Sequence, residues 1–243
     1  GEGVVAVTET ECRHREGYGA EKNAYAVVHK LSFCSNADLQ IPNQRKNGYL
    51  YAMKNIVFDL GGVLFARDKN KSTQEFHEFF SFIRSERMPL FWEEYDRGAS
   101  TLGEVTDMLA RTTGCPREKC ERFLLLSIDM QEPVAPTERL VGDLKAAGYR
   151  LYVLSNMSRE FIAFLRRFPV YRLFDGEVVS CEEGTVKPEP RIYEILLERY
   201  GLDPAETLFI DDRAANIAAA EGLGIAGYLF DHRNPAAACG ALR

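Results

Sequence analysis

The chain has 243 residues, of which 46% are hydrophobic and 27% charged, and it carries a formal net charge of -6 with a pI near 5.4. This acidic balance argues against a general affinity for nucleic acid or anionic membranes, although it allows a locally positive pocket the size of a phosphate group. No stretch reaches the roughly 18 apolar residues of a membrane span, so we expect a soluble globular protein with one large core or a core domain and a smaller one.

The first part of the chain differs from the rest. Residues 1–52 mix turn-forming and charged residues with little helical or strand periodicity, and the regular pattern begins at Met53. We therefore expect an N-terminal extension over residues 1–52 that is outside the main fold or not native to the protein. The first residues also lack an export signal, and the six cysteines form no C-x-x-C pair, which together predict a reducing, cytoplasmic location.

From residue 53 onward, apolar runs alternate with helical patterns, as in a β-α-β arrangement with a parallel sheet. The apolar runs predict strands, and three helical patterns stop at glycine, which is a common helix end. The expected strands are 56–58, 151–154, 208–210 and 225–230, and the expected helices end near Gly148, Gly201 and Gly222. The predicted fold is therefore α/β, a Rossmann-like doubly wound parallel sheet.

Residues 67–134 break this alternation because they show helical periodicity only. One helix in this stretch is marked by a capping box, in which Thr101 and Glu104 satisfy backbone N–H groups at the helix start. We predict that residues 53–66 and 135–243 form the core domain and that residues 67–134 form a helical cap inserted after the first strand. A cap inserted there lies over the carboxyl edge of the sheet, where it can exclude water and select substrates.

Polar side chains follow the predicted strands and one loop between them. They are Asp59, Ser155, Asn156, Lys187, Asp211 and Asp212. Each of them alone is more typical of a helix cap, a turn or a solvated loop. Because the carboxyl ends of parallel strands meet at one edge of the sheet, where open α/β folds bind ligands, the joint pattern predicts an active site.

Four segments resemble the four motifs of the haloacid dehalogenase (HAD) superfamily, in the same order, and the similarity covers about residues 54–231. The segments are Phe58-Asp59-Leu60-Gly61-Gly62-Val63-Leu64, Leu154-Ser155-Asn156, Lys187-Pro188 and Ile210-Asp211-Asp212. The resemblance implies a sheet of order 3-2-1-4-5, with the strand ending at Asp59 between those ending at Ser155 and Asp211. The first segment and the later Asp96-Arg97-Gly98-Ala99-Ser100-Thr101 resemble the subgroup that includes glucose-1-phosphate phosphatases.

The resemblance implies a role for each residue around the phosphate. Asp59 would attack phosphorus and form an aspartyl-phosphate, which divides one difficult displacement into two easier ones. Lys187 would neutralise the phosphate and keep Asp59 ionised. The Ser155 hydroxyl and the Asn156 backbone N–H would bind the phosphate oxygens, and Gly62 would allow the tight turn beside them.

The same resemblance implies Mg²⁺ as the cofactor. The ion would be held by Asp59, the backbone carbonyl of Gly61 and the Asp211-Asp212 pair. We favour Asp212 as the direct ligand, with Asp211 acting directly or through water. An oxygen-rich site with no cysteine or histidine nearby in the motifs suits a hard cation of this kind.

Gly61 departs from the family pattern, because most phosphatases of the family carry a second aspartate there as general acid and base. Proton donation contributes about 10² to 10⁴ in rate, so its loss would least affect substrates with an acidic leaving group, such as an anomeric phosphate. Asp68 is a candidate substitute acid, although its position is more typical of a cap for the next segment.

The function that follows is a Mg²⁺-dependent phosphatase of a small phosphorylated metabolite, such as a sugar phosphate. Two alternatives stay open. One is a metal-independent haloacid dehalogenase, and the other is a catalytically weak protein that binds a phosphorylated ligand. The Asp211-Asp212 pair favours the phosphatase over the dehalogenase, because carboxylates packed beside Asp59 would repel one another without a cation.

Overall fold

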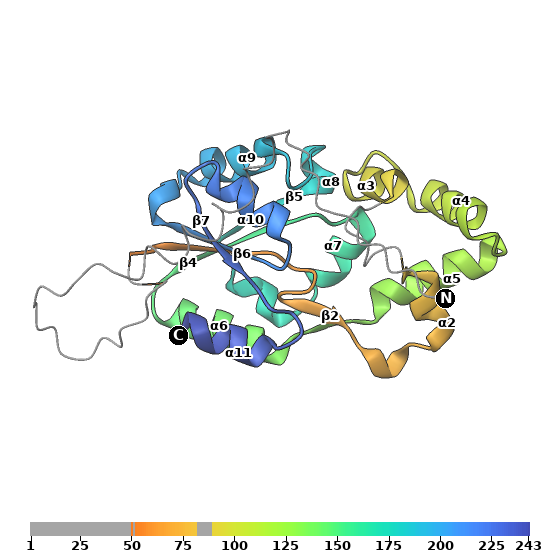
Figure 1. The fold of residues 1–243 in the computed structure, drawn as a ribbon, viewed down its shortest axis with the longest axis horizontal. Helices are drawn as coiled ribbons and strands as arrows, with labels where there is room; N and C mark the ends of the chain where they lie inside the picture. The colour runs from red at the N-terminus through yellow and green to blue at the C-terminus, as the bar shows by residue number, and fades with distance from the viewer. Residues whose placement is uncertain (1–49, 51, 82–88) are drawn as a thin grey trace, which may run out of the picture. The chain divides into compact units, whose positions relative to one another are not determined.

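The core of the fold is a sheet of five parallel strands in the order β5-β4-β1-β6-β7 (Figure 1). The structure is a computed structural model, and it describes residues 50, 52–81 and 89–243. The strands are β1 (Asn55–Phe58), β4 (Arg150–Ser155), β5 (Gly176–Val179), β6 (Thr207–Asp211) and β7 (Ala226–Leu229). The predicted α/β class and strand order are confirmed, because β1 lies between β4 and β6.

Helices cover both faces of the sheet, so its strands are almost continuously apolar. One face packs against α6 (Ala135–Ala146), α7 (Arg159–Leu165) and α11 (Pro235–Leu242), and the other packs against α9 (Pro190–Tyr200) and α10 (Ala214–Glu221). Figure 1 shows α6 and α11 on the opposite side of the sheet from α9 and α10.

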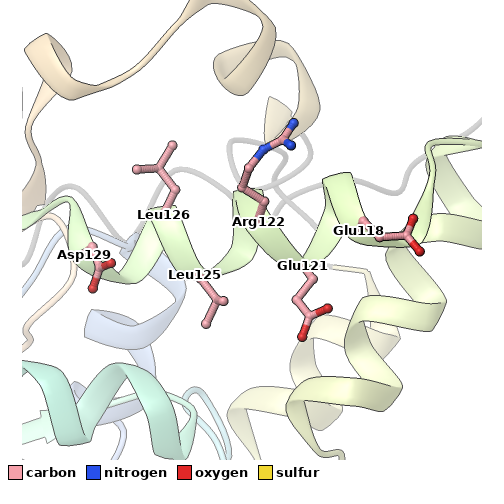
Figure 2. Close-up of a pocket in the computed structure, with 6 residues that line it drawn as sticks. All are labelled: Glu118, Glu121, Arg122, Leu125, Leu126 and Asp129. Carbon is pink, nitrogen blue, oxygen red and sulfur yellow. The ribbon is translucent and has the colours of Figure 1, made fainter.

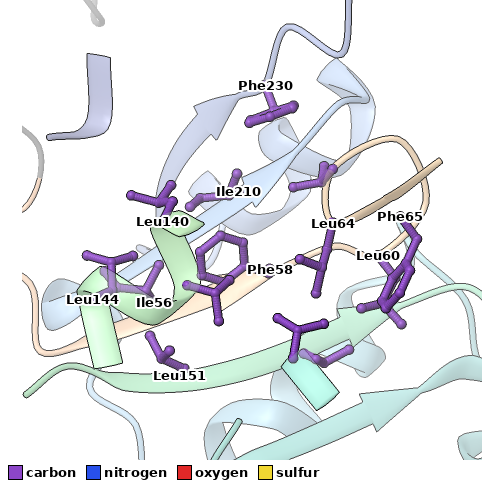
Figure 3. Packing of buried hydrophobic residues seen from close by; sticks show 14 of the residues in the cluster. Ile56, Phe58, Leu60, Leu64, Phe65, Leu140, Leu144, Leu151, Ile210 and Phe230 are labelled. Carbon is purple, nitrogen blue, oxygen red and sulfur yellow. The ribbon is translucent and has the colours of Figure 1, made fainter. Parts of the chain in front are cut away.

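Side chains of β1 alternate between these two faces, as the period of a strand requires. Ile56 and Phe58 pack with the cluster that includes Leu140 and Leu144 of α6 (Figure 3). Val57 joins the cluster on the other face. All three strand residues are fully buried. Asp59, the first residue after the strand, is therefore held at the carboxyl edge by a rigid, fully packed element.

The stretch after β1 forms a separate group of helices, which we call the cap. Its helices are α2 (Gln74–Phe79), α3 (Leu90–Asp96), α4 (Leu102–Thr113) and α5 (Arg117–Asp129), preceded by the short turn η1 (Lys69–Lys71). They share an aromatic-rich core of their own, which Phe161 of α7 joins. The predicted capping box is present at α4: the Glu104 N–H donates to Thr101 Oγ1 at 3.3 Å, and the Thr101 N–H donates to Glu104 Oε2 at 2.8 Å.

The expectation that residues 67–134 are helical throughout is wrong at their ends. The strand β2 (Phe65–Arg67) pairs in antiparallel fashion with β3 (Gln131–Pro133), where the chain leaves the core and returns to it. Each strand has only three residues, which is too short to leave a periodic signal in the sequence. The edge strand β5 was not predicted from the sequence. Two of its four residues are a glycine and a glutamate, which are uncommon in strands.

The remaining short elements are η3 (Pro169–Leu173), α8 (Ser180–Glu183) and η4 (Pro204–Glu206). In the part of the chain that the structure describes, no helix is both long and apolar enough to pass through a membrane. The N-terminal extension expected over residues 1–52 lies almost wholly outside the described residues.

Candidate active site

Asp59 is the centre of the site. Its Oδ1 accepts three hydrogen bonds: from the Leu60 N–H at 2.7 Å, from Ser155 Oγ at 2.7 Å and from Lys187 Nζ at 2.9 Å. No described residue donates to Oδ2. The carboxylate is thus fixed in one orientation with one oxygen left for other partners, and only 7% of the residue is exposed.

Lys187 links the carboxylates of two different strands. Its ammonium donates to Asp59 Oδ1, to Asp211 Oδ2 at 2.7 Å and to the Leu154 carbonyl at 3.0 Å, so all three protons have partners. Burial of the side chain opposes the charge, but Asp211 and Asp59 outweigh it and hold the pKa of Lys187 above its usual value. The lysine is therefore charged and sealed from solvent.

Asp211 and Asp212 occupy different environments. Asp211 is fully buried, and both of its oxygens accept hydrogen bonds, from Lys187, from the Arg213 N–H at 2.7 Å and from Asn216 Nδ2 at 2.9 and 3.1 Å. The Asp212 side chain is 18% exposed and lies 3.4 Å from His232 Nδ1. Of the pair, Asp212 is the one that faces outward.

The three acidic side chains converge at the carboxyl edge. One carboxylate oxygen each from Asp59, Asp211 and Asp212 lies within 4.8 Å of the others. Burial raises the pKa of Asp59 to about 6, with Lys187 opposing and the two neighbouring carboxylates adding to the rise. Burial and Asp211 likewise raise the pKa of Asp212 to about 6. A compact set of hard oxygen donors that repel one another fits a divalent cation such as Mg²⁺.

Comparison with known proteins assigns this arrangement to a family. The profile of the haloacid dehalogenase-like hydrolase family matches residues 53–224. The chain belongs to this family. It is a HAD-like hydrolase, as the four segments predicted, whereas the narrower subgroup stays a prediction.

Individual relatives cover most of this HAD chain. It is 30% identical over 72% of its length to sesquiterpene phosphatase astK of Aspergillus oryzae, covering 88% of that protein. It is 27% identical over 71% of its length to D-ribitol-5-phosphate phosphatase of Bacteroides thetaiotaomicron, covering 89% of it. In other curated relatives the matched segment makes up only 10% or 34% of a larger protein.

A solved structure shows the same fold. It is a mutant HAD family enzyme from Bacteroides thetaiotaomicron in complex with magnesium and inorganic phosphate. The TM-score is 0.60 with 25% identity, and the match covers 74% of this chain and 95% of the other.

Asn156 has a role in this HAD site that the sequence did not predict. Its side-chain amide pairs with the backbone of Lys187: Asn156 Nδ2 donates to the Lys187 carbonyl at 2.9 Å, and the Lys187 N–H donates to Asn156 Oδ1 at 2.8 Å. The amide therefore fixes the loop that carries the lysine. The expected contact of the Asn156 backbone N–H with phosphate stays a prediction, as does phosphate binding by Ser155, Lys187 and Gly62.

Glycine is required at position 62 both by the backbone conformation and by the closeness of the Asp212 side chain. Its φ of +80° lies in the left-handed region, and a Cβ added there would lie 2.4 Å from Asp212 Oδ2. Gly61 is different, because a Cβ there would come within 3.2 Å of Met157 Cε, the end of a flexible side chain. Met157 thus packs beside the position where the family's second aspartate usually stands.

The Gly62→Ala substitution should lower the free energy of unfolding by about 2 to 4 kcal/mol, because it adds both left-handed strain and a clash with Asp212. Gly148→Ala is the matched control, since Gly148 has a φ of +90° and no neighbour within 4 Å of an added Cβ, so it incurs the strain alone. Urea denaturation of both variants tests this. Equal losses would show that the approach to Asp212 is unimportant.

The cap is attached to the site at the end of α3, another feature missed from the sequence. Tyr95 Oη donates to Glu160 Oε2 at 2.7 Å, and the Arg97 guanidinium donates to both oxygens of Glu189 at 2.6 and 2.9 Å. The hydrogen bond from Arg97 is the main reason that the pKa of Glu189 falls to about 2. Glu189 is two residues from Lys187, so these contacts join the cap to the loop that carries Lys187.

A shallow, open hollow lies elsewhere on the described surface. It encloses about 460 Å³ and is formed on the outside of α5, as Figure 2 shows. Its lining residues are Glu118, Glu121, Arg122, Leu125, Leu126 and Asp129. None of them belongs to the Asp59 cluster, so this open hollow is not the active site.

Proposed function

We propose that the protein is a Mg²⁺-dependent phosphatase that hydrolyses a small phosphorylated metabolite through an aspartyl-phosphate on Asp59. The observation that supports it most is the convergence of Asp59, Asp211 and Asp212 around a single point, with Lys187 bonded to two of them. Positive charge and a cation site beside a fixed carboxylate are what attack on a phosphate dianion requires.

In the proposed reaction, an oxygen of Asp59 forms a bond to phosphorus while the bond from phosphorus to the alcohol oxygen breaks. Water then attacks the same phosphorus, the bond to Asp59 breaks, and inorganic phosphate leaves. Ser155 and Lys187 hold Oδ1 of Asp59 throughout, so the carboxylate is oriented before the substrate arrives. Lys187 also offsets the negative charge that accumulates when substrate binds.

Asp59, the Gly61 carbonyl and Asp212 would hold the metal directly. Asp211 would act on it indirectly, because its oxygens already accept hydrogen bonds from Lys187, Arg213 and Asn216. When bound, Mg²⁺ would offset the repulsion between Asp59 and the phosphate dianion. The metal-bound and phosphate-bound HAD structure supports this choice of ion.

The names of the relatives support a small organic phosphate as substrate. One acts on D-ribitol 5-phosphate and another is a sesquiterpene phosphatase, so the leaving alcohol differs widely within the family. We propose a phosphorylated metabolite such as a sugar phosphate, in the cytoplasm. The metal-independent dehalogenase is disfavoured by the three adjoining carboxylates, and a weak phosphate-binding role is an outcome that the experiment below can reveal.

A phosphate-release screen over sugar 1-phosphates, sugar 6-phosphates, nucleotides and an aryl phosphate tests the proposal. Activity should need Mg²⁺, fall to background in EDTA and return when Mg²⁺ is added in excess. Turnover that persists in EDTA would contradict the metal-dependent mechanism, and halide release from a haloacid in EDTA would support the dehalogenase. Ligand binding without turnover across the panel would support the binding protein.

A further inference from the structure

The proposed function leaves one step without a residue, because Gly61 cannot protonate the departing alcohol. Asp68, the substitute considered from the sequence, accepts a hydrogen bond from the Asn70 N–H at 2.9 Å and lies 3.8 Å from Lys71 Nζ. It therefore caps the turn at η1, and none of these contacts involves the Asp59 cluster.

Asp96, the last residue of α3, is placed differently. Its backbone carbonyl accepts a hydrogen bond from Ser180 Oγ, and the same hydroxyl accepts one from the Met157 N–H at 3.0 Å. Met157 is the residue whose methyl group packs beside Gly61. Ser180 and Met157 thus connect the Asp96 backbone to Gly61, the position where the second aspartate is missing.

The flanking residues of Asp96 hold it against the core from both sides. Tyr95 bonds to Glu160 of α7, and Arg97 bonds to Glu189 in the Lys187 loop. Arg159 Nη1 also donates to the Gly98 carbonyl at 2.8 Å. These contacts fix the end of α3, and with it the backbone of Asp96, relative to the loop that carries Lys187.

The Asp96 carboxyl interacts with charged groups of the candidate site. It interacts electrostatically with Asp59 and Lys187 from the core, with Arg213 in the loop after β6 and with Glu93 on its own helix. Burial is the largest cause that holds the pKa of Asp96 well above its usual range, with Asp59 and Glu93 adding to the rise and Arg213 and Lys187 opposing it. The residue as a whole is nevertheless partly exposed to solvent.

We propose that Asp96 is the general acid and base of this enzyme, supplied by the cap in place of the aspartate missing at Gly61. In the first step, the Asp96 proton passes to the alcohol oxygen as its bond to phosphorus breaks. In the second step, the Asp96 carboxylate takes a proton from the water that attacks phosphorus, and the acid is restored. This inference rests on the proposed phosphatase function.

The test compares Asp96→Asn with the wild-type protein on two substrates, a simple alkyl phosphate and an aryl phosphate, in Mg²⁺. The alkyl alcohol needs a proton to leave, so its release should slow by about 10² to 10⁴-fold in the first turnover. The aryl group leaves without help, so its first-turnover burst should slow by less than about 10-fold. Later turnovers should be slow with both substrates, because the variant cannot take the proton from the attacking water. Aspartyl-phosphate should therefore accumulate with the aryl substrate.

Glu94→Gln is the matched control, because it removes one negative charge from an exposed position on the same helix. It should leave both rates unchanged. Equal slowing of the aryl and alkyl bursts in Asp96→Asn, or no slowing of either, would overturn the inference. If the wild-type protein shows no Mg²⁺-dependent release at all, the proposed function fails instead, so the two failures are distinguishable. The aryl burst also reports that Asp96→Asn is folded.

Discussion

Replacing Asp59 with asparagine should abolish phosphate release, with kcat lowered by at least about 10⁴-fold, because an amide cannot form the proposed acyl phosphate. The asparagine side chain would still fill the same space, so loss of activity could not be ascribed to a cavity. Steady-state phosphate release in Mg²⁺, at equal protein concentration, measures the effect.

Asp68→Asn is the control for the nucleophile. Asp68 directly follows β2 and caps its own turn, so its substitution should leave kcat within about 3-fold of the wild-type value. Phosphate release by Asp59→Asn at a rate near that of Asp68→Asn would remove Asp59 from the nucleophile role.

Trapping of the proposed aspartyl-phosphate provides an independent test of Asp59 as the nucleophile. Acid quenching during turnover should leave the mass of one phosphoryl group on the peptide that contains Asp59 in the wild-type protein, and none in Asp59→Asn. A phosphoryl group on a different residue would contradict the assignment even if the variant were inactive.

The sequence was sufficient to predict which strand ends carry the residues of the candidate site. Asp59, Ser155 and Asp211 each end or follow a strand that is largely apolar, and parallel strands bring their carboxyl ends to one edge whatever the details of packing. Lys187 could be added only through the family motif, since it lies on a loop and no periodic pattern marks it. The structure then shows its ammonium between two of the predicted carboxylates.

Contacts between the cap and the core could not be predicted in the same way. They depend on where α3 ends relative to α7, α8 and the Lys187 loop, and sequence spacing does not determine that relation. The pairing of Arg97 with Glu189 spans 92 residues, and Asp96 is an ordinary acid at a helix end until its neighbours are known. The side-chain amide of Asn156 was likewise not assigned a partner, because its bonds are to the backbone of a distant loop.

The placement of Asp96 on the cap has a consequence for how the site is assembled. In a HAD phosphatase with the second aspartate after the nucleophile, one loop carries both the nucleophile and the proton donor. Here the proposed nucleophile follows β1 and the proposed donor is on α3, so the donor would be correctly placed only while the cap contacts at Glu160 and Glu189 are intact. Correct docking of the cap would then be a condition for proton transfer as well as for excluding water.

Lys187→Met should lower kcat by about 10² to 10³-fold and the free energy of unfolding by about 3 to 5 kcal/mol. The substitution preserves most of the side-chain volume but leaves Asp59 and Asp211 buried without their shared cation. Because Lys187 lowers the pKa of Asp59, its loss should raise that pKa, so the remaining activity should begin at a higher pH than in the wild-type protein. Urea denaturation and pH-rate profiles measure the two effects.

Lys54→Met is the control for charge removal, because Lys54 makes a surface ion pair with Glu206 at 2.6 Å and its side chain is 64% exposed. Such a pair contributes less than about 1 kcal/mol, so this variant should keep both stability and activity. If Lys187→Met lost no more stability than Lys54→Met, the buried carboxylates would not depend on the lysine for their charge. If it kept wild-type kcat with an unshifted profile, Lys187 would have no part in holding Asp59 ionised or in binding the phosphate.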